Sequence, residues 1–302
     1  MNTPILFLIF NRPDVTLRVF NAIREAQPLK LFVAADGPRK HFPSDAIKCQ
    51  QTREIIKHID WPCEVQTLFR DENLGCRRAV SGGITWFFEH VEDGIILEDD
   101  CLPHPDFFKL SETLLEKYRH NPKVMHISGG NYQFGQWRGE GSYYFSRISH
   151  IWGWASWRRA WEHYDVDMRD LPEFLRERHR FFINDELEKY WIFNFKRMYR
   201  GSDTWDYQWS YAVMKNNGFC INSNINLISN IGFGDEATHS SSKVSPLANM
   251  KTASLPDIIH PSAIKFDDDA DIFTVQVAFP MPSLRKMVFM KVKKEIKKLL
   301  RL

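Results

Sequence analysis

The sequence contains three consecutive carboxylates, Glu98, Asp99 and Asp100, which follow directly after the apolar residues 94–97. That apolar run has the length and the β-branching of a buried strand. Because the ligand crevice of an open α/β sheet lies at the carboxyl ends of its strands, we expect the three acids at the mouth of a site. Side chains alternate along an extended chain, so Glu98 and Asp100 should point one way and Asp99 the other.

Clustered carboxylates repel one another unless a cation lies among them. Oxygen ligands of this kind suit Mg²⁺ or Mn²⁺, and such an ion usually keeps several waters and binds phosphate oxygens of a substrate. The alternative interpretation is a solvated acidic turn, since runs of charge are commonly surface features. The residues at the ends of the neighbouring strands distinguish these two interpretations.

Strand and helix patterns alternate at short spacing through the first third of the chain. Apolar runs predict strands at residues 4–10, 29–35, 64–70 and 94–97, and helical spacing predicts helices at 15–25, 45–59 and 77–90. This alternation is typical of βαβ units, whose strands form a largely parallel sheet. The predicted fold class is therefore α/β, with a mostly parallel, Rossmann-like central sheet flanked by helices.

Each predicted strand is followed by a polar or charged residue. Arg12 follows the first strand and Asp36 the second. Asp71 and Asn73 follow the third strand, before the acids at the end of the fourth. The carboxyl ends of parallel strands share one edge of the sheet, so these side chains should converge. Convergence of four strand ends favours a binding site over an isolated acidic turn.

The chain from there to residue 282 is predicted to continue the same domain. Helices are expected at residues 105–118, 171–200 and 203–215, and short strands at 124–128, 143–147, 218–221 and 225–228. Residues 231–250 have little periodicity and many Gly and Ser. They indicate either a mobile loop that closes on a bound substrate or a plain connector. We expect one domain over residues 1–282.

Four tryptophans, Trp152, Trp154, Trp157 and Trp161, fall within ten residues. One interpretation is the core of a helix, because large rings are mostly buried packing surfaces. The other is a wall of a ligand pocket, because aromatic faces stack on the C–H surfaces of sugars. Both interpretations stay open at this point.

Composition argues against several classes of protein. No stretch of about 18 apolar residues predicts a membrane-spanning helix. The N-terminus lacks the basic region and cleavage site of a signal peptide, so we expect none. The five cysteines form no CxxC pair, which favours reduced thiols in a cytosol over a disulfide framework. We therefore expect a cytoplasmic protein.

Charge is unevenly distributed along the chain. Residues 284–302 hold eight Lys/Arg and one Glu, whereas the rest holds 32 Lys/Arg and 37 Asp/Glu. The basic excess thus lies wholly in the tail, which argues against a broad nucleic-acid-binding surface. Within the tail (residues 283–302), apolar residues recur every fourth position from Leu284 to Leu300, which predicts a basic amphipathic helix. Such a helix could lie on the anionic inner face of a membrane, or dock on an acidic protein surface.

With these residues assembled, the chain resembles the GT-A glycosyltransferases over roughly residues 5–239. More narrowly, it is similar to bacterial relatives of N-acetylglucosaminyltransferase I, within the nucleotide-diphospho-sugar transferase superfamily. The most specific part is LEDD at 97–100, with Pro103 and then PDFF at 105–108. The resemblance implies a GT-A fold with a nucleotide-binding half (1–130) and an acceptor half (131–250). It implies a nucleotide-diphosphate sugar as donor, with UDP-sugars favoured.

The resemblance also assigns roles to the strand-end residues. In that family the acid triplet is a variant of the DxD motif, and its last Asp, here Asp100, holds Mn²⁺ (or Mg²⁺) on the donor diphosphate. Glu98 would contact the ribose or the waters of the metal, and Asp99 would belong to the same donor site. Arg12 is similar to an Arg beside the nucleotide, and Asp36 is similar to the acid that hydrogen-bonds the uracil.

Further roles come from later segments. Asn73, which stands where the family has a His, and Arg77 fall where the family places base and ribose contacts. The segment IWGW, ending at Trp154, resembles the glycine-tryptophan segment near the donor sugar. The segment WDYQW at 205–209 resembles the Trp-Asp-Asp-Trp segment that supplies the catalytic base, here Asp206. His239 matches a late His close to the metal–diphosphate site.

The resemblance therefore implies metal-dependent, inverting transfer of a hexosyl or N-acetylhexosaminyl group to a saccharide or lipid-linked acceptor, in surface polysaccharide or glycolipid synthesis. Asp206 would accept the proton of the acceptor hydroxyl, although taken alone it could also cap a helix. Two other functions stay open. One is a nucleotidyltransferase on a similar sheet, against which the lack of glycine at 10–13 counts. The other is a non-catalytic, membrane-associated module that binds sugar nucleotides.

Overall fold

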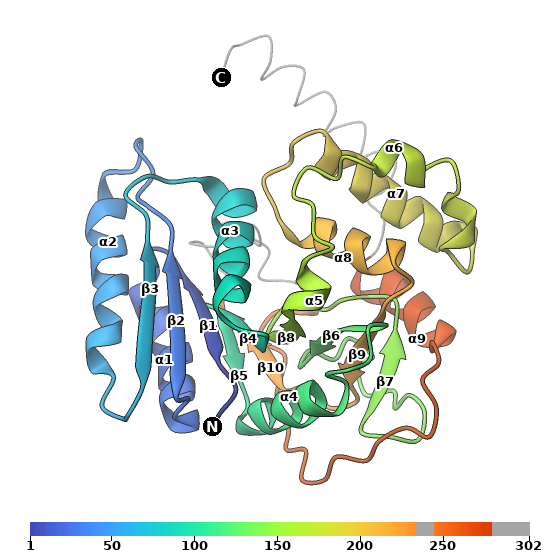
Figure 1. Cartoon of the computed structure of the whole chain (residues 1–302), viewed down its shortest axis with the longest axis horizontal. Helices are drawn as coiled ribbons and strands as arrows, with labels where there is room; N and C mark the ends of the chain where they lie inside the picture. Colours follow the sequence, from blue (N-terminus) through green and yellow to red (C-terminus); the bar gives the residue numbers. More distant parts are fainter. Residues whose placement is uncertain (234–244, 280–302) are drawn as a thin grey trace.

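The computed structural model describes residues 1–233 and 245–279, and the predicted helix of the tail lies outside these residues. The first third of the chain alternates strands with helices, as predicted (Figure 1). Its strands are β1 (Ile5–Ile9), β2 (Lys30–Ala35), β3 (Glu64–Phe69) and β4 (Asp93–Glu98). Its helices are α1 (Pro13–Ala26), α2 (Pro43–Glu54) with the short η1 (Ile55–His58), and α3 (Gly75–His90).

An eight-stranded sheet runs through the molecule in the order β3-β2-β1-β4-β8-β6-β9-β7. Its later strands are β6 (Val124–Ser128), β7 (Tyr143–Ser146), β8 (Trp154–Trp157) and β9 (Phe219–Ser223). Four neighbouring pairs are parallel, and three pairs, which involve β7 or β8, are antiparallel. The predicted α/β fold with a mostly parallel central sheet flanked by helices is confirmed. A separate pair joins β5 (Cys101–Pro103) to β10 (Ile228–Asn230).

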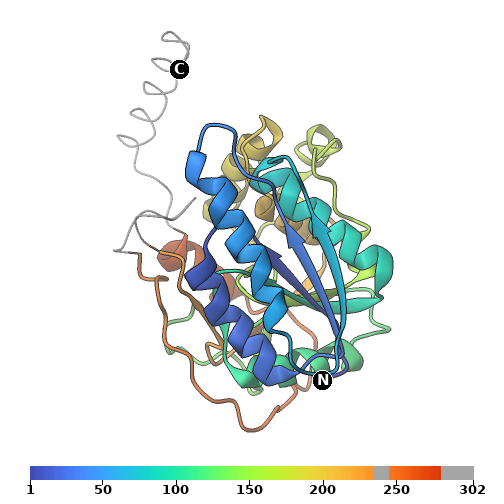
Figure 2. The ribbon, with the colours of Figure 1, turned by 90° about the vertical axis from the view of Figure 1, so that its left-hand side faces the viewer.

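Helices cover both faces of the parallel strands (Figure 2). Ile5, Phe7 and Ile9 of β1 share a hydrophobic cluster with α1, whereas Leu6 and Leu8 share another with α3. This period of two is what a strand buried on both faces requires, and each such side chain contributes about 1.5–3 kcal/mol by leaving water. The helices thereby hold the carboxyl ends of β1, β2 and β4 open at one edge of the sheet.

The remaining helices differ in one place from the prediction. They are α4 (Pro105–Lys117), α5 (Arg158–Trp161), α6 (Leu171–Phe174), α7 (Asp185–Tyr199), α8 (Asp206–Lys215) and α9 (Asp268–Phe273), with the short η2 (Arg178–Arg180) and η3 (Thr274–Ala278). The single helix expected over 171–200 is wrong, because the chain breaks between α6 and α7. Asn184 starts α7 afresh, since its side chain accepts a hydrogen bond of 2.9 Å from the backbone N–H of Leu187.

The strand expected at 225–228 is also wrong, because β10 begins only at Ile228. Asparagine side chains bind the backbone in this region instead. The Asn226 amide donates to the carbonyls of Ile228 and Lys251, and the Asn224 amide donates to that of Gly141. Such side-chain bonds to the backbone compete with a strand ladder.

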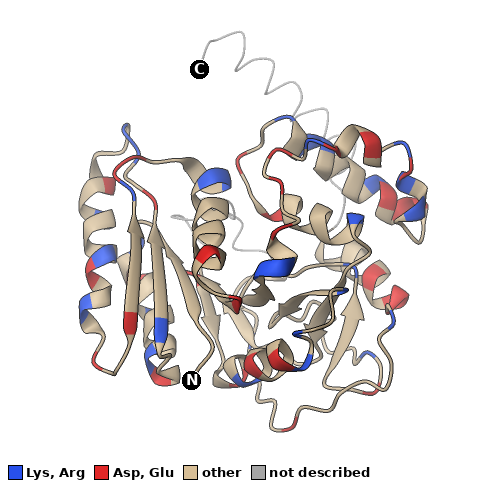
Figure 3. Ribbon diagram, in the orientation of Figure 1, with Lys and Arg blue, Asp and Glu red and all other residues tan. Residues whose placement is uncertain are grey.

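Charged residues of both signs are interspersed along the described helices (Figure 3). Within residues 1–233 and 245–279, no helix has the length and apolar character needed to cross a membrane.

The Trp-rich stretch at 151–161 is not one helix, since it forms the strand β8 and then the single turn α5.

Candidate functional site

A cavity of about 390 Å³ opens at the edge of the sheet where β1, β2 and β4 end. This volume lies in the range of small-molecule sites. Most of the site residues predicted from the sequence line it: Arg12, Asp36, Asn73, Glu98, Asp99, Asp100 and Asp206. The described residues Arg77 and Trp154 do not line it, and His239 lies outside the described part of the chain.

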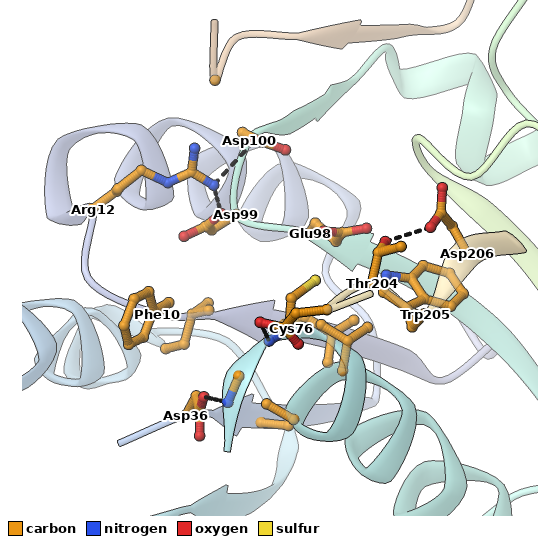
Figure 4. Close-up of a pocket in the computed structure, with 18 of the residues that line it drawn as sticks. Phe10, Arg12, Asp36, Cys76, Glu98, Asp99, Asp100, Thr204, Trp205 and Asp206 are labelled. Atoms are coloured by element: carbon orange, nitrogen blue, oxygen red, sulfur yellow. Dashed lines mark hydrogen bonds and ion pairs between the residues drawn. The ribbon is translucent and has the colours of Figure 1, made fainter. Parts of the chain in front are cut away.

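Two acids of the triplet, Asp99 and Asp100, contact a single guanidinium, that of Arg12 (Figure 4). One terminal nitrogen of Arg12 contacts Asp99 Oδ1 and lies 3.0 Å from Asp100 Oδ2. Asp99 and Asp100 therefore face the same cation, and the expected alternation of the three acids is wrong. The reason is that β4 ends at Glu98, and the next two residues form a turn in which strand alternation no longer applies.

Burial and mutual repulsion set the charge of this cluster. Burial raises the pKa of Glu98 well above its ordinary value, and the nearby Asp100 and Asp99 raise it further. Burial also raises the pKa of Asp99, although Arg12 opposes that shift. The charges that act on Glu98 thus come from three other acids, Asp99, Asp100 and Asp206, and from one paired arginine, Arg12. This imbalance leaves the site with a capacity for added positive charge.

The acid triplet is the candidate site for a divalent ion in this cavity. The described residues contain no ready group of three His, Cys, Asp or Glu side chains that could enclose a metal. Asp100 faces the cavity, however, and the buried Asp99 Oδ2 has no hydrogen-bond partner among the described residues. Such a donor set fits Mg²⁺ or Mn²⁺ when phosphate oxygens and waters supply the other ligands. Gly232 also packs tightly here, since a Cβ on it would lie 2.1 Å from Asp100 Oδ2.

Asp36 performs a structural task in this edge of the sheet. Its carboxylate accepts hydrogen bonds of 2.9–3.2 Å from the backbone N–H groups of Gly37, Leu74 and Gly75 and from the side-chain amide of Asn73. A carboxylate has about four lone-pair sites, so these four donors use them all. Asp36 and Asn73 therefore join the end of β2 to the start of α3, and the carboxylate offers no spare acceptor to a base.

Asp203 is a lining residue that the sequence prediction missed. Its carboxylate accepts hydrogen bonds from the backbone N–H groups of Cys76 (3.3 Å) and Arg77 (2.8 Å) at the start of α3. These N–H groups have no partner within the helix, and a negative charge is favourable there. The bond to Arg77 spans 126 positions, so no local pattern could have revealed it. It ties the segment before α8 to the nucleotide-binding half that the resemblance predicts.

Asp206 stands across the cavity from the end of β4 (Figure 4). It is the first residue of α8, whereas the N-cap position belongs to Trp205. The hydroxyl of Thr204 donates a hydrogen bond to the Asp206 carboxylate and thereby orients it. The next side chain, Tyr207, has its hydroxyl 3.1 Å from that of Tyr190. The carboxylate therefore lies at the wall of the cavity in a held orientation, as a general base requires.

Trp154 belongs to the core instead of the cavity. It is 1% exposed and stacks between His126, with ring centroids 5.1 Å apart, and Trp205, with centroids 5.7 Å apart. Trp152, two positions earlier and partly exposed, lines the cavity in its place. Both earlier interpretations of the Trp-rich stretch thus apply, to different members of it.

Arg77 is held away from the cavity by the loop that precedes α6. Its guanidinium donates to the carbonyl of Val166 at 2.5 Å and pairs with Asp167 at 3.0 Å. In this structure Arg77 therefore does not line the cavity, and its predicted contact with a ligand stays a prediction. Several other residues that the sequence prediction did not include also line the cavity. Among them are Phe10, Arg39, Arg70, Cys76, Thr204 and Asn230. Burial, with nearby acids, raises the pKa of the Cys76 thiol, which keeps it protonated.

Neither a family model nor a curated protein matches this sequence. Among solved structures, the chain is similar to an apo UDP-glucose pyrophosphorylase at 13% identity and a TM-score of 0.40, over 76% of this chain and 93% of that one. It is similar to HddC from Yersinia pseudotuberculosis at 12% identity and a TM-score of 0.34, over 57% of this chain and 86% of the other. The galactosyltransferase LgtC, solved with donor and acceptor sugar analogs, matches at 9% identity and a TM-score of 0.35, over 57% and 64%. Likeness at this level carries no conclusion about the reaction, which must come from the site itself.

Proposed function

We propose that this chain is a metal-dependent, inverting glycosyltransferase that uses a nucleotide-diphosphate sugar as donor. The observation that supports this most is one cavity that combines Arg12, the acid triplet at the end of β4 and Asp206 on a separate helix. A cation site for a diphosphate and a carboxylate across from it are the two parts that transfer to a hydroxyl needs. The acceptor is proposed to be a saccharide or a lipid-linked sugar, in surface polysaccharide or glycolipid synthesis.

Asp100 would be the protein ligand of Mn²⁺ or Mg²⁺ in this proposal, and His239 a second candidate from outside the described residues. When bound, the ion would supply charge neutralisation on the leaving diphosphate. One nitrogen of Arg12 contacts both Asp99 and Asp100, so its positive charge lies beside the proposed metal ligand Asp100. It can therefore also contact phosphate oxygens of the donor, as guanidinium groups commonly do.

Asp206 would carry out the proton transfer. Its carboxylate accepts the proton of the acceptor hydroxyl, while the hydroxyl oxygen bonds to the anomeric carbon and the bond from that carbon to the diphosphate breaks. The reacting sugar gains oxocarbenium-like character as this bond breaks. Attack from the face opposite to the diphosphate inverts the anomeric centre. Trp152, a partly exposed ring on the wall of the cavity, offers a stacking surface for a sugar.

A turnover assay tests the proposal directly. Purified protein is given UDP-sugars with Mn²⁺, with Mg²⁺ or with EDTA, and release of UDP is measured with and without a saccharide acceptor. We expect release only with a divalent ion, because the diphosphate leaving group needs its charge neutralised. Equal turnover in EDTA would contradict metal dependence. Failure of every nucleotide diphosphate to bind the folded protein in calorimetry would contradict the use of sugar nucleotides.

We also propose that residues 283–302 place the enzyme on the inner face of a membrane, close to a lipid-linked acceptor. Each cation near an anionic surface contributes roughly 1 kcal/mol, and the segment carries eight of them from residue 284 onward. The full chain is expected to sediment with vesicles that contain phosphatidylglycerol and not with pure phosphatidylcholine. Removal of residues 283–302 should abolish this binding, and high salt should weaken it. Unchanged sedimentation of the truncated chain would disprove the proposal.

A further inference from the structure

Arg70 is a cationic lining residue to which the proposed function assigns no task. It directly follows β3, and its side chain is partly exposed on the wall of the cavity. In the sheet order, β2 and β1 lie between β3 and β4, so three strand spacings separate Arg70 from the acid triplet. At the usual spacing between strands this is roughly 14 Å. Arg70 therefore marks the end of the cavity that is remote from the proposed diphosphate site.

Three arginines line the cavity, and their partners differ. Arg12 pairs with Asp99 and Asp100. Arg39 is held by Asp45 through contacts of 2.6 Å and 3.0 Å. Within the described part of the chain, by contrast, the Arg70 guanidinium makes no hydrogen bond or ion pair with a side chain or a carbonyl, and burial lowers its pKa. A partly buried cation without a partner is unfavourable, so an acceptor supplied by a ligand would be favoured there.

The acid whose charge acts on Arg70 cannot take that role. The charge of Asp36 partly offsets the effect of burial on the pKa of Arg70. However, the Asp36 carboxylate is occupied by three backbone N–H groups and the Asn73 amide, as described above. The four lone-pair sites of Asp36 are therefore filled, and the donors of Arg70 stay available to a ligand.

The Arg70 guanidinium packs closely against the helix α3 at Gly82. A Cβ on Gly82 would lie 3.0 Å from Arg70 Nη2, so the glycine leaves room for the arginine at this point. A glycine inside a helix is unfavourable relative to alanine, and a close approach of another group is a common reason for one. The apolar side chains of Phe10, Ala79 and Val80 line the same cavity and suit a flat ring.

We propose that Arg70 selects the nucleobase of the donor, by donating hydrogen bonds to a base that presents a ring carbonyl at that edge. This inference rests on the proposed function and deepens it. A guanidinium carries five N–H donors and no acceptor. Uracil, thymine and guanine present a carbonyl oxygen where cytosine and adenine present an exocyclic amine. With cytosine or adenine, the N–H donors of Arg70 would face the donor N–H groups of the exocyclic amine. Arg70 therefore favours bases with a carbonyl oxygen (oxo bases) over bases with an amine (amino bases) at that position. It replaces Asp36, which the resemblance implied as the base reader.

Matched pairs of nucleotides isolate this effect from ring size. The Kd values of UDP and CDP, and of GDP and ADP, are measured by calorimetry with Mn²⁺ present. Within the pair whose ring size fits, we expect the oxo base to bind at least about tenfold more tightly, because a buried donor left unpaired is costly. An amino base that binds as tightly as its oxo partner overturns the inference.

Substitution of Arg70 tests whether this residue is the cause. Arg70→Met keeps the apolar stem and removes the donors, so the affinity for the oxo base should fall about 10- to 100-fold. The affinity for the amino base should stay within about threefold of the wild-type value. The ratio of the affinity for the oxo base to that for the amino base should therefore fall toward one. Arg70→Lys should restore part of the affinity. With a transferable donor, KM should rise and kcat should stay nearly unchanged, because Arg70 lies far from the reacting atoms.

Arg78→Met is the matched control. Arg78 lies on α3, its side chain is 61% exposed, and it contacts Asp167 outside the cavity. We expect the oxo-to-amino ratio of this variant to equal that of the wild type. If Arg70→Met keeps the wild-type ratio while turnover persists, the inference falls and the proposed function stands. If the folded wild type binds none of the four nucleotides, both fall together.

Discussion

Replacement of Asp206 by asparagine is expected to lower kcat by about 10²- to 10⁴-fold and to leave donor affinity unchanged. Asparagine has the same shape but cannot take up the proton of the acceptor hydroxyl. Asp206 begins α8 and faces the cavity, with Thr204 donating to its carboxylate, so the substitution alters chemistry more than structure. Steady-state turnover with donor and acceptor measures the first quantity, and calorimetry with UDP and Mn²⁺ measures the second.

Two neighbouring variants control for charge and for orientation. Asp203→Asn removes the same charge from the same cavity but keeps an oxygen that can accept from the N–H groups of α3, so its kcat should fall less than about fivefold. Thr204→Val keeps the base and removes its orienting hydroxyl, so the loss should be intermediate. Wild-type kcat in Asp206→Asn would rule out this residue as the base. A loss in Asp203→Asn as large as in Asp206→Asn would point to bulk electrostatics instead.

The first half of the fold follows from local patterns because its strands are short apolar runs separated by amphipathic helices. The runs at 4–10 and 29–35 became β1 and β2 with little change of boundary. Parallel strands place their carboxyl ends together, so the convergence of Arg12, Asp36 and Glu98 could be predicted without coordinates. This part of the site could therefore be predicted from residue types and from the order of the elements along the chain.

What could not be predicted depends on contacts between distant segments. The Asp203 bond to α3 joins residues 126 positions apart. The burial of Trp154 depends on stacking with Trp205, which the chain reaches only later. The turn after Glu98 brings Asp99 and Asp100 onto one side of Arg12, whereas a strand pattern continued by two residues predicts the opposite. No sequence pattern pointed to Arg70 as a site residue. What distinguishes Arg70 is that its guanidinium has no partner among the described residues, which only the structure shows.

Arg12 also changes how the acid triplet should respond to mutation. In this structure the guanidinium partly neutralises Asp99 and Asp100 together. Loss of Asp100 leaves Arg12 paired with Asp99 and removes a charge that helps to raise the pKa of the buried Glu98. The substitution relieves the repulsion between Asp100 and Glu98 but removes the ion pair between Asp100 and Arg12. These two effects oppose each other, so the stability of the fold should change little.

Asp100→Asn is therefore expected to separate stability from function. Without added metal, its melting temperature should lie within a few degrees of the wild-type value, since a change of about 1 kcal/mol or less shifts the midpoint only by that much in a chain of this size. Mn²⁺ with UDP should raise the melting temperature of the wild type through binding to the folded state, and this increase should vanish in the variant. Turnover should fall by about 10²- to 10⁴-fold, which corresponds to the several kcal/mol that a metal supplies to a leaving diphosphate. A variant that melts normally and still gains stability and turnover from Mn²⁺ would show that Asp100 is not the ligand, and the cation would then have to be sought at another residue of the cavity.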